Sequence, residues 1–211
     1  MKYLKMLGLA AIAAGALMAF AGAGTASATE LTCSAGVMCT APTTIHATSE
    51  GHATLDSPIG NISCEGTVSG EANTGSSTTT VSGGGTVSFF NCTEGATVHV
   101  LANGTLEIHT EYTKEADGHE TQNAASTGNG TLTSTGTEVT VEFRGFHCIF
   151  RTKETDIGTV TGSKNNAGKT ATLDINGRIP AVGGRSGIFC GSTSPWTGSY
   201  LITTPDYLDI D

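Results

Sequence analysis

The stretch TATLDINGRI, Thr170 to Ile179, decides the fold class. Apolar residues occupy alternate positions along it, and polar residues fill the positions between them. The apolar residues are Ala171, Leu173, Ile175 and Ile179. A period of two is typical of a β-strand with one buried face. The Asn176-Gly177 pair is typical of a hairpin, but the alternation continues through it, so we expect one strand with a bulge at Gly177.

Other short stretches show the same alternation. In EVTVEF, Glu138 to Phe143, we expect Val139, Val141 and Phe143 to point inward and Glu138, Thr140 and Glu142 to point outward. Further strand candidates are TVSFF (86–90), HCIFR (147–151), IGTVTG (157–162) and SYLIT (199–203). The chain is rich in Thr, Gly and Ser, residues typical of strands and turns rather than helices. It predicts an all-β fold of about nine to eleven strands, an antiparallel β-sandwich that is Ig-like or jelly-roll-like and stapled by disulfides.

Two long polar stretches are expected to be loops. The first, ANTGSSTTTVSGGG from Ala72 to Gly85, is low in complexity. The second, KEADGHETQNAASTGNG from Lys114 to Gly130, shows no apolar period and is expected to be disordered or a loose excursion.

The N-terminus resembles an export signal. Lys2 and Lys5 precede the apolar run LGLAAIAAGALMAF, and Ala26-Ser27-Ala28 is a small-residue cleavage site. The alternative, a membrane anchor, is disfavoured because the run is short for a membrane span. Without a twin arginine, the general secretory route is expected. Residues 1–28 are therefore predicted to be a signal peptide and residues 29–211 a single domain, of which 29–42 form an N-terminal extension with a small Cys33/Cys39 loop.

The charge of the exported chain bounds its partners. Removal of Lys2 and Lys5 leaves eight basic residues against nineteen acidic ones, a net charge near −11. Such a chain repels nucleic acid and anionic membranes. We expect it to be secreted or associated with the cell wall, with no membrane span in the mature part and an unknown extracellular or cell-surface partner. The sequence does not determine its oligomeric state.

Six cysteines predict disulfides in an exported chain. No C-x-x-C motif occurs, which argues against a zinc knuckle or a thioredoxin-like site. We favour the sequential pairing Cys33–Cys39, Cys64–Cys92 and Cys148–Cys190 among the 15 connectivities that six cysteines allow. The alternative for Cys33 and Cys39 is a reactive or intermolecular pair.

A metal site is one interpretation of ATVHVLANGTLEIHT, Ala96 to Thr110. A hairpin with the three-residue loop 102–104 and a left-handed Gly104 would place Val98 and Val100 on one face. The opposite face would then bring His99, Glu107 and His109 together. Two imidazoles and a carboxylate are ligands that suit zinc or copper. The alternative is ordinary pairing of polar side chains on a wet surface. No other cofactor is expected.

Evidence for catalysis is weak. No G-x-S-x-G motif occurs, and GGRSG (183–187) has the wrong spacing for one. Carboxylates that could serve a glycosidase fall mostly at outward strand positions: Glu65, Glu107, Glu142 and Asp174. The aromatic residues around Cys148 and Cys190 are expected to pack in the core, namely Phe143, Phe146, Phe150, Phe189 and the single Trp196. The C-terminal PDYLDID, with Asp206, Asp209 and Asp211, is expected to be an acidic tail.

The stretches NISCEGTVSG, SFFNCTEGATVHV, FHCIF and FCGSTSPWTGSYLITTP resemble secreted bacterial proteins of unassigned function. The spacing of Cys64/Cys92 and Cys148/Cys190 among the strands more loosely resembles the PraB family, secreted activators of alkane oxidation. The resemblance implies an exported accessory protein without enzymatic activity, acting through adhesion, matrix association or interfacial assistance. The alternatives are a small-ligand or metal-binding module and an extracellular hydrolase.

Overall fold

The computed structural model describes residues 30–72, 80–110, 112–114, 120–122, 128–167 and 169–211. The regular secondary structure of these residues consists of β-strands alone. The strands are β1 (Leu31–Ser34), β2 (Val37–Met38), β3 (Thr43–Ser49), β4 (Ala53–Ser57), β5 (Gly60–Ala72), β6 (Thr80–Phe90), β7 (Ala96–Ala102), β8 (Thr105–Thr110), β9 (Tyr112–Lys114), β10 (Glu120–Gln122), β11 (Asn129–Thr135), β12 (Glu138–Phe143), β13 (Phe146–Arg151), β14 (Thr155–Thr161), β15 (Thr172–Pro180), β16 (Thr193–Thr204) and β17 (Asp209–Ile210). All pairings between them are antiparallel. The predicted all-β antiparallel class is confirmed. The predicted signal peptide lies outside the described residues.

β15 forms as one strand, as its alternation predicts. Leu173, Ile175 and Ile179 are buried, while Asp174 and Arg178 between them are exposed. Its pairing with β16 continues from Thr172 to Pro180 without a shift. The bulge expected at Gly177 is therefore absent, because the strand keeps its register through the glycine.

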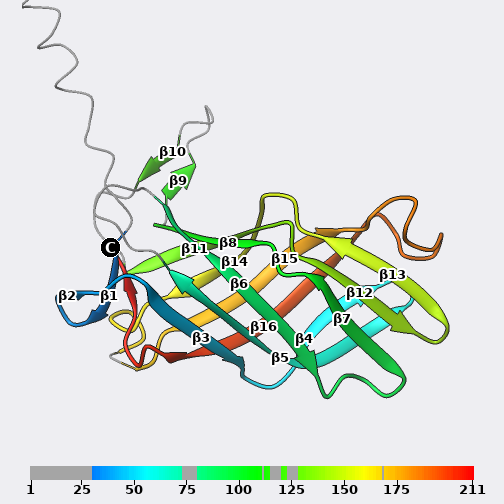
Figure 1. Cartoon of the computed structure of the whole chain (residues 1–211), viewed down its shortest axis with the longest axis horizontal. Coiled ribbons are helices and arrows are strands. Elements are labelled where there is room, and N and C mark those ends of the chain that lie inside the picture. The colour runs from blue at the N-terminus through cyan, green and yellow to red at the C-terminus, as the bar shows by residue number, and fades with distance from the viewer. Residues whose placement is uncertain (1–29, 73–79, 111, 115–119, 123–127, 168) are drawn as a thin grey trace, which may run out of the picture.

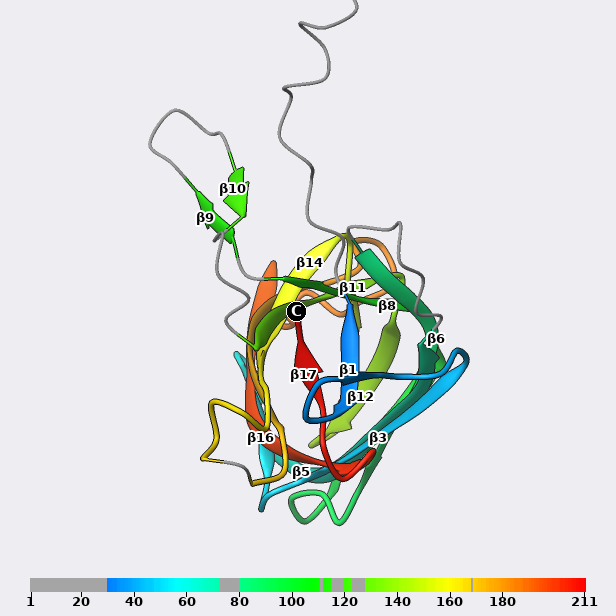
Figure 2. The same ribbon diagram turned by 90° about the vertical axis from the view of Figure 1, so that its left-hand side faces the viewer.

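The main sheet closes on itself at one end of the molecule. Its order is β15-β14-β11-β8-β6-β5-β3-β16, and β16 pairs again with β15. β3 and β4 follow one another along β5, so they share one position in the sheet. Figure 2 shows the resulting barrel from its end. Closure removes the open edges that such a sheet would otherwise expose.

At the other end the barrel opens into a sandwich. Three strands of the barrel continue, after a short break, into three strands of the sandwich: β8 into β7, β11 into β12, and β14 into β13. The pairing register is continued across each break. Thr105 pairs with Thr135, and Ala102, just beyond the break, pairs with Glu138. The outer halves, β7, β12 and β13, form a separate three-stranded sheet. Figure 1 shows this sheet at the right of the molecule. The predicted sandwich is thus one half of the fold.

Buried hydroxyl groups bind the breaks together. Ser134 Oγ lies 2.9 Å from both Thr137 Oγ1 and Thr152 Oγ1. The Thr137 N–H donates to Thr152 Oγ1 at 3.0 Å, and the Thr137 hydroxyl donates to the Asn103 carbonyl at 2.6 Å. These bonds replace the ladder hydrogen bonds that end at the breaks, since buried polar groups need partners.

The two ends of the described chain cover the closed end of the barrel. Leu31 in β1 pairs with Ile210 in β17, and both side chains are fully buried with Leu208. Figure 2 shows β1 and β17 across the barrel end. The expectation of an acidic tail is therefore wrong at Asp209, which is buried. Its carboxylate accepts the Lys164 N–H at 2.9 Å and the Tyr207 hydroxyl at 2.5 Å.

Three disulfides have the sequential pairing that the sequence favours. Cys33–Cys39 closes the β1–β2 turn, Cys64–Cys92 ties β5 to the turn after β6, and Cys148–Cys190 ties β13 to the loop after β15. Disulfides persist in oxidising compartments, so the folded chain belongs to such a compartment.

Some local expectations are wrong. Glu138 and Thr140 are buried rather than outward. Residues 181–190 follow the edge of β13 and bring Arg185 to Glu138, while His147 Nε2 lies 3.0 Å from Thr140 Oγ1. The expected loop at 72–85 is shorter, since β6 begins at Thr80; residues 73–79 lie outside the described part. The expected loop at 114–130 includes β10 and the start of β11, and its remaining residues are largely undescribed.

Candidate functional site

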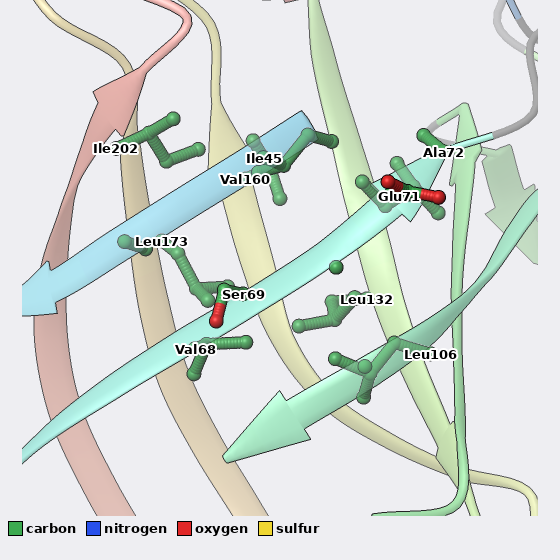
Figure 3. Close-up of a pocket in the computed structure, with 14 residues that line it drawn as sticks. Ile45, Val68, Ser69, Glu71, Ala72, Leu106, Leu132, Val160, Leu173 and Ile202 are labelled. Atoms are coloured by element: carbon green, nitrogen blue, oxygen red, sulfur yellow. The ribbon is translucent and has the colours of Figure 1, made fainter. Parts of the chain in front are cut away.

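The closed half of the barrel contains a cavity of about 70 Å³. Aliphatic side chains converge on it from opposite sides of the barrel, as Figure 3 shows. The aliphatic lining residues are Ile45, Ala47, Val68, Ala72, Leu106, Ile108, Leu132, Val160, Leu173 and Ile202. Ser69 and Glu71 also border it, but they occupy the outward positions of β5, between buried Val68 and Ala72.

Small residues on three neighbouring strands create this space. Ala47 on β3, Gly70 and Ala72 on β5, and Gly85 on β6 border the same region. Large side chains fill the interior of an eight-stranded barrel, so replacing them with glycine or alanine on one side leaves a void. The opposite wall keeps its larger residues, among them Leu132 and Val160.

The barrel wall parts beside the cavity. β5 and β6 share pairs from Glu65↔Phe90 to Gly70↔Gly85. Beyond Gly85, β6 pairs with β8, while Glu71 and Ala72 of β5 pair with β3. An open groove of about 620 Å³ lies over this point and shares Gly70 and Gly85 with the cavity. Its polar border includes Thr44, Ser69, Glu71, Thr86 and Asn103. Among the described residues, the groove and the cavity therefore meet at the seam between β5 and β6; residues 73–79, which join the two strands, lie outside the described part.

The aliphatic lining of the cavity suits small apolar molecules. The side chains that face into it from the described strands are aliphatic, so they offer neither a nucleophile nor a general acid. Apolar cavities of this kind remain dry and accept apolar guests. The glutamate and hydroxyl groups of the groove stand at the entrance.

A second, smaller cavity of about 40 Å³ lies in the sandwich half. It is bordered by Trp196 and Phe89, whose rings meet edge to face with centroids 5.8 Å apart. Trp196 is buried, so the expectation that this residue packs in the core is confirmed. Val139 and Val141 of β12 close the cavity from the other layer.

The hairpin that would assemble His99, Glu107 and His109 does not form. β7 pairs with β12 and β8 pairs with β6 and β11, so the chain continues in one direction past the break. Gly104 is left-handed, as expected, with φ of 66°. His99 lies in β7 of the small sheet and Glu107 in β8 of the main sheet, on opposite sides of the break. Glu107 and His109 lie 3.8 Å apart on one face of β8, and the described residues hold no group of three or more His, Cys, Asp or Glu placed to bind a metal.

The other residues considered for catalysis have local structural contacts. Glu65 accepts a hydrogen bond from Asn91 Nδ2 at 3.2 Å, and Asp174 accepts one from the Ser199 hydroxyl at 2.6 Å. Glu142 lies 3.4 Å from His147 Nδ1. In the GGRSG segment, the Ser186 hydroxyl donates to the Ile149 carbonyl at 2.8 Å and accepts from the Ile149 N–H at 3.0 Å. Ser186 thus fixes a strand edge.

Two aromatic residues assigned to the core are exposed. Phe143 and Phe150 are buried, as expected, but Phe146 is 39% exposed and Phe189 57% exposed. Their rings contact each other edge to face with centroids 5.3 Å apart. The glycine-rich context of Phe189 is the one sequence signal that favours an exposed loop at this point.

A buried carboxylate was also missed. The Glu138 side chain is only 4% exposed and forms ion pairs with Arg151 and Arg185, the latter at 2.9 Å. Both arginine side chains are about half exposed. The alternation of EVTVEF places Glu138 on a polar face, and nothing in that stretch indicates that residues 181–190 cover it.

No family model, curated protein or solved structure matches the chain. None of the described segments forms a helix that could span a membrane.

Proposed function

We propose that the chain is an exported accessory protein without enzymatic activity that binds a small uncharged aliphatic molecule inside its barrel. The observation that carries this proposal is the aliphatic cavity beneath the Gly70/Gly85 seam. The groove over the seam supports it, because a ligand needs a path between solvent and the interior.

The size of the cavity limits the ligand. An engineered apolar cavity of about 150 Å³ accepts benzene or xenon. The present cavity has about half that volume, which suits xenon or a hydrocarbon of roughly two to four carbon atoms. A larger ligand would have to displace Leu106 at the seam or widen the separation of β5 and β6.

Export and accessory action are part of the same proposal. The oxidising environment that three disulfides require is consistent with secretion by the general secretory route and with release or retention in the cell wall. Assistance to enzymes that act on apolar compounds, which the resemblance to the PraB family implies, is a role that such a binding site would serve.

The test uses the secreted protein labelled at its Ile, Leu and Val methyl groups. Xenon and propane are titrated separately while methyl NMR spectra are recorded. We expect saturable shifts at Leu106, Leu132 and Val160 and none at Val98 in the sandwich half. Ala47→Val should abolish these shifts by filling the cavity, and Ala72→Val provides a second cavity-filling variant.

Thr197→Val is the matched control, since Thr197 is exposed on β16 and borders neither the cavity nor the groove. Equal shifts throughout the protein, or unchanged binding in both cavity-filling variants, would refute the proposal. Turnover of a hydrolase substrate that survives purification and is lost on a single substitution would refute the absence of enzymatic activity.

A further inference from the structure

An exposed apolar cluster lies at the end of the molecule opposite to the β1–β17 sheet. It consists of Phe146, Ile188 and Phe189, which we call the apolar tip. Ile188 is 91% exposed, the largest exposed fraction among the large hydrophobic residues of the described chain. The turn between β12 and β13 and the loop after β15 form this end, at the right of Figure 1. Contiguous exposed apolar residues mark interaction sites in soluble proteins.

The loop that carries the apolar tip is held in place. The Cys148–Cys190 disulfide joins it to β13 one residue beyond Phe189. The Gly187 N–H donates to the His147 carbonyl at 3.2 Å, and Ser186 bonds both backbone groups of Ile149. The tip is thus presented on a fixed support, which lowers the entropy lost when it binds.

The area of the tip is too small for a stable dimer. Its three side chains expose on the order of 400 Å² in total, whereas a specific protein interface buries about 800 Å² on each partner. Three apolar side chains are enough for contact with a lipid surface. Phe and Ile side chains need to enter only the boundary between the headgroups and the acyl chains.

The charge around the tip differs from that of the rest of the chain. Residues 144–151 and 181–191 contain three of the four arginines and no Asp or Glu, although acidic residues outnumber basic ones in the whole chain. The nearest carboxylate of the same hairpin is that of Glu142, which lies 3.4 Å from His147 Nδ1. Arg151 and Arg185 share one carboxylate, that of buried Glu138, which leaves this trio positive. Arg144 lies over the Phe143 ring at 4.8 Å, in the turn next to Phe146. Arginine beside exposed apolar residues complements anionic headgroups.

We propose that the apolar tip docks on an anionic lipid surface. Ile188, Phe189 and Phe146 enter the interface, and Arg144 and Arg185 meet the phosphate groups. The net negative charge of the chain opposes contact through its other faces, so binding occurs with the tip toward the lipid and the barrel directed away from it.

The experiment measures co-sedimentation of the secreted protein with phosphatidylglycerol/phosphatidylcholine vesicles and with pure phosphatidylcholine vesicles. We expect binding to the anionic vesicles and at least about tenfold weaker binding to the neutral ones. Ile188→Ser with Phe189→Ser should reduce binding to anionic vesicles by roughly tenfold or more. Arg144→Gln should reduce it severalfold and weaken its dependence on salt.

The matched control is Val37→Ser with Met38→Ser. Val37 and Met38 are 59% and 47% exposed, and they lie in β2 at the opposite end of the molecule. This variant should bind anionic vesicles like the unaltered protein. Near-ultraviolet circular dichroism confirms that each variant folds.

Three results would overturn the proposal. They are absence of vesicle binding, equal loss of binding in the tip and control variants, and equal affinity for neutral and anionic vesicles. Analytical ultracentrifugation tests a second copy of the chain as the occupant: a dimer that the tip variant abolishes, without vesicle binding, would assign the tip to self-association. Xenon binding in the barrel is independent of each of these outcomes.

Discussion

Gly70 pairs directly with Gly85, and this is the last pair that β5 and β6 share. Beyond it β6 pairs with β8, whereas β5 continues to pair with β3, which is already its neighbour at Gly70. Two glycines at the point of separation contribute no side chain to either face. Both glycines border the aliphatic cavity.

The first prediction concerns this seam. A Cβ atom at Gly85 would lie 2.5 Å from Leu106 Cδ1 and 2.8 Å from Leu106 Cγ, so Gly85→Ala must displace the Leu106 side chain. Leu106 borders the cavity, and its displacement is expected to reduce the space available to a ligand. We expect xenon affinity to fall severalfold in methyl NMR titrations. An unchanged affinity would show that the Leu106 side chain does not border the bound ligand.

The second prediction tests the break between β7 and β8. Gly104 has φ of 66°, and a Cβ atom there would lie 2.3 Å from Thr137 N and 2.4 Å from Thr135 O. Backbone atoms cannot move aside, so Gly104→Ala should lower the free energy of unfolding by more than about 3 kcal/mol or prevent folding. Gly36 has φ of 75° with no atom within 4 Å of its Cβ position. Gly36→Ala should cost only the left-handed strain, about 1 kcal/mol.

Urea unfolding of both variants provides the measurement. If the two substitutions had equal effects, backbone strain rather than the close approach at Thr135 and Thr137 would explain the cost. The comparison isolates the steric contribution, because both glycines have the left-handed conformation and differ in the space around their Cβ positions.

The third prediction concerns Glu138. Glu138→Gln removes a buried charge from Arg151 and Arg185, and we expect a loss of about 1–3 kcal/mol in the free energy of unfolding. The cost stays below that of a fully buried pair because both arginines reach solvent. Glu142→Gln is the control, since its side chain is 54% exposed and should cost at most about 0.5 kcal/mol. Equal losses in the two variants would contradict a structural role for the buried trio.

The alternation of apolar and polar residues predicts a strand's buried face best where the opposite face of the strand is exposed to solvent. β15 keeps its alternation along its whole length because Asp174 and Arg178 face solvent. β12 has the same pattern, yet Glu138 and Thr140 are buried. Arg185, which pairs with Glu138, lies in a loop more than forty residues later in the chain, and no local period can indicate this contact.

The hairpin predicted to assemble the metal site does not form, for a similar reason. Turn chemistry at Asn103-Gly104 indicated a left-handed glycine, which is correct. Whether the chain reverses there depends on which strand pairs with β7, and that strand is β12, which follows later in the sequence. The cavity also escaped prediction, because Gly70 and Gly85 come together only through the register of β5 and β6.

The fourth prediction concerns alkaline pH. Tyr200 is completely buried, and its hydroxyl has no hydrogen-bond partner among the described residues. Burial disfavours the phenolate and raises the pKa of Tyr200 well above the usual value near 10. The folded state therefore holds this proton more tightly than the unfolded chain does. Above about pH 10 the unfolded chain binds fewer protons, so the free energy of unfolding should decrease as pH rises further.

Tyr200→Phe separates this effect from the other titrating groups. At neutral pH the variant loses a hydroxyl without a partner, so its free energy of unfolding should be unchanged or higher by up to about 1 kcal/mol. Above about pH 10 it should lose stability less steeply than the unaltered protein, because one raised pKa is gone. Tyr207, whose pKa is raised by its hydrogen bond to Asp209, remains in both proteins and cancels from the comparison. Urea unfolding across the alkaline range measures both slopes, and parallel slopes would mean that the Tyr200 hydroxyl reaches solvent in the folded state.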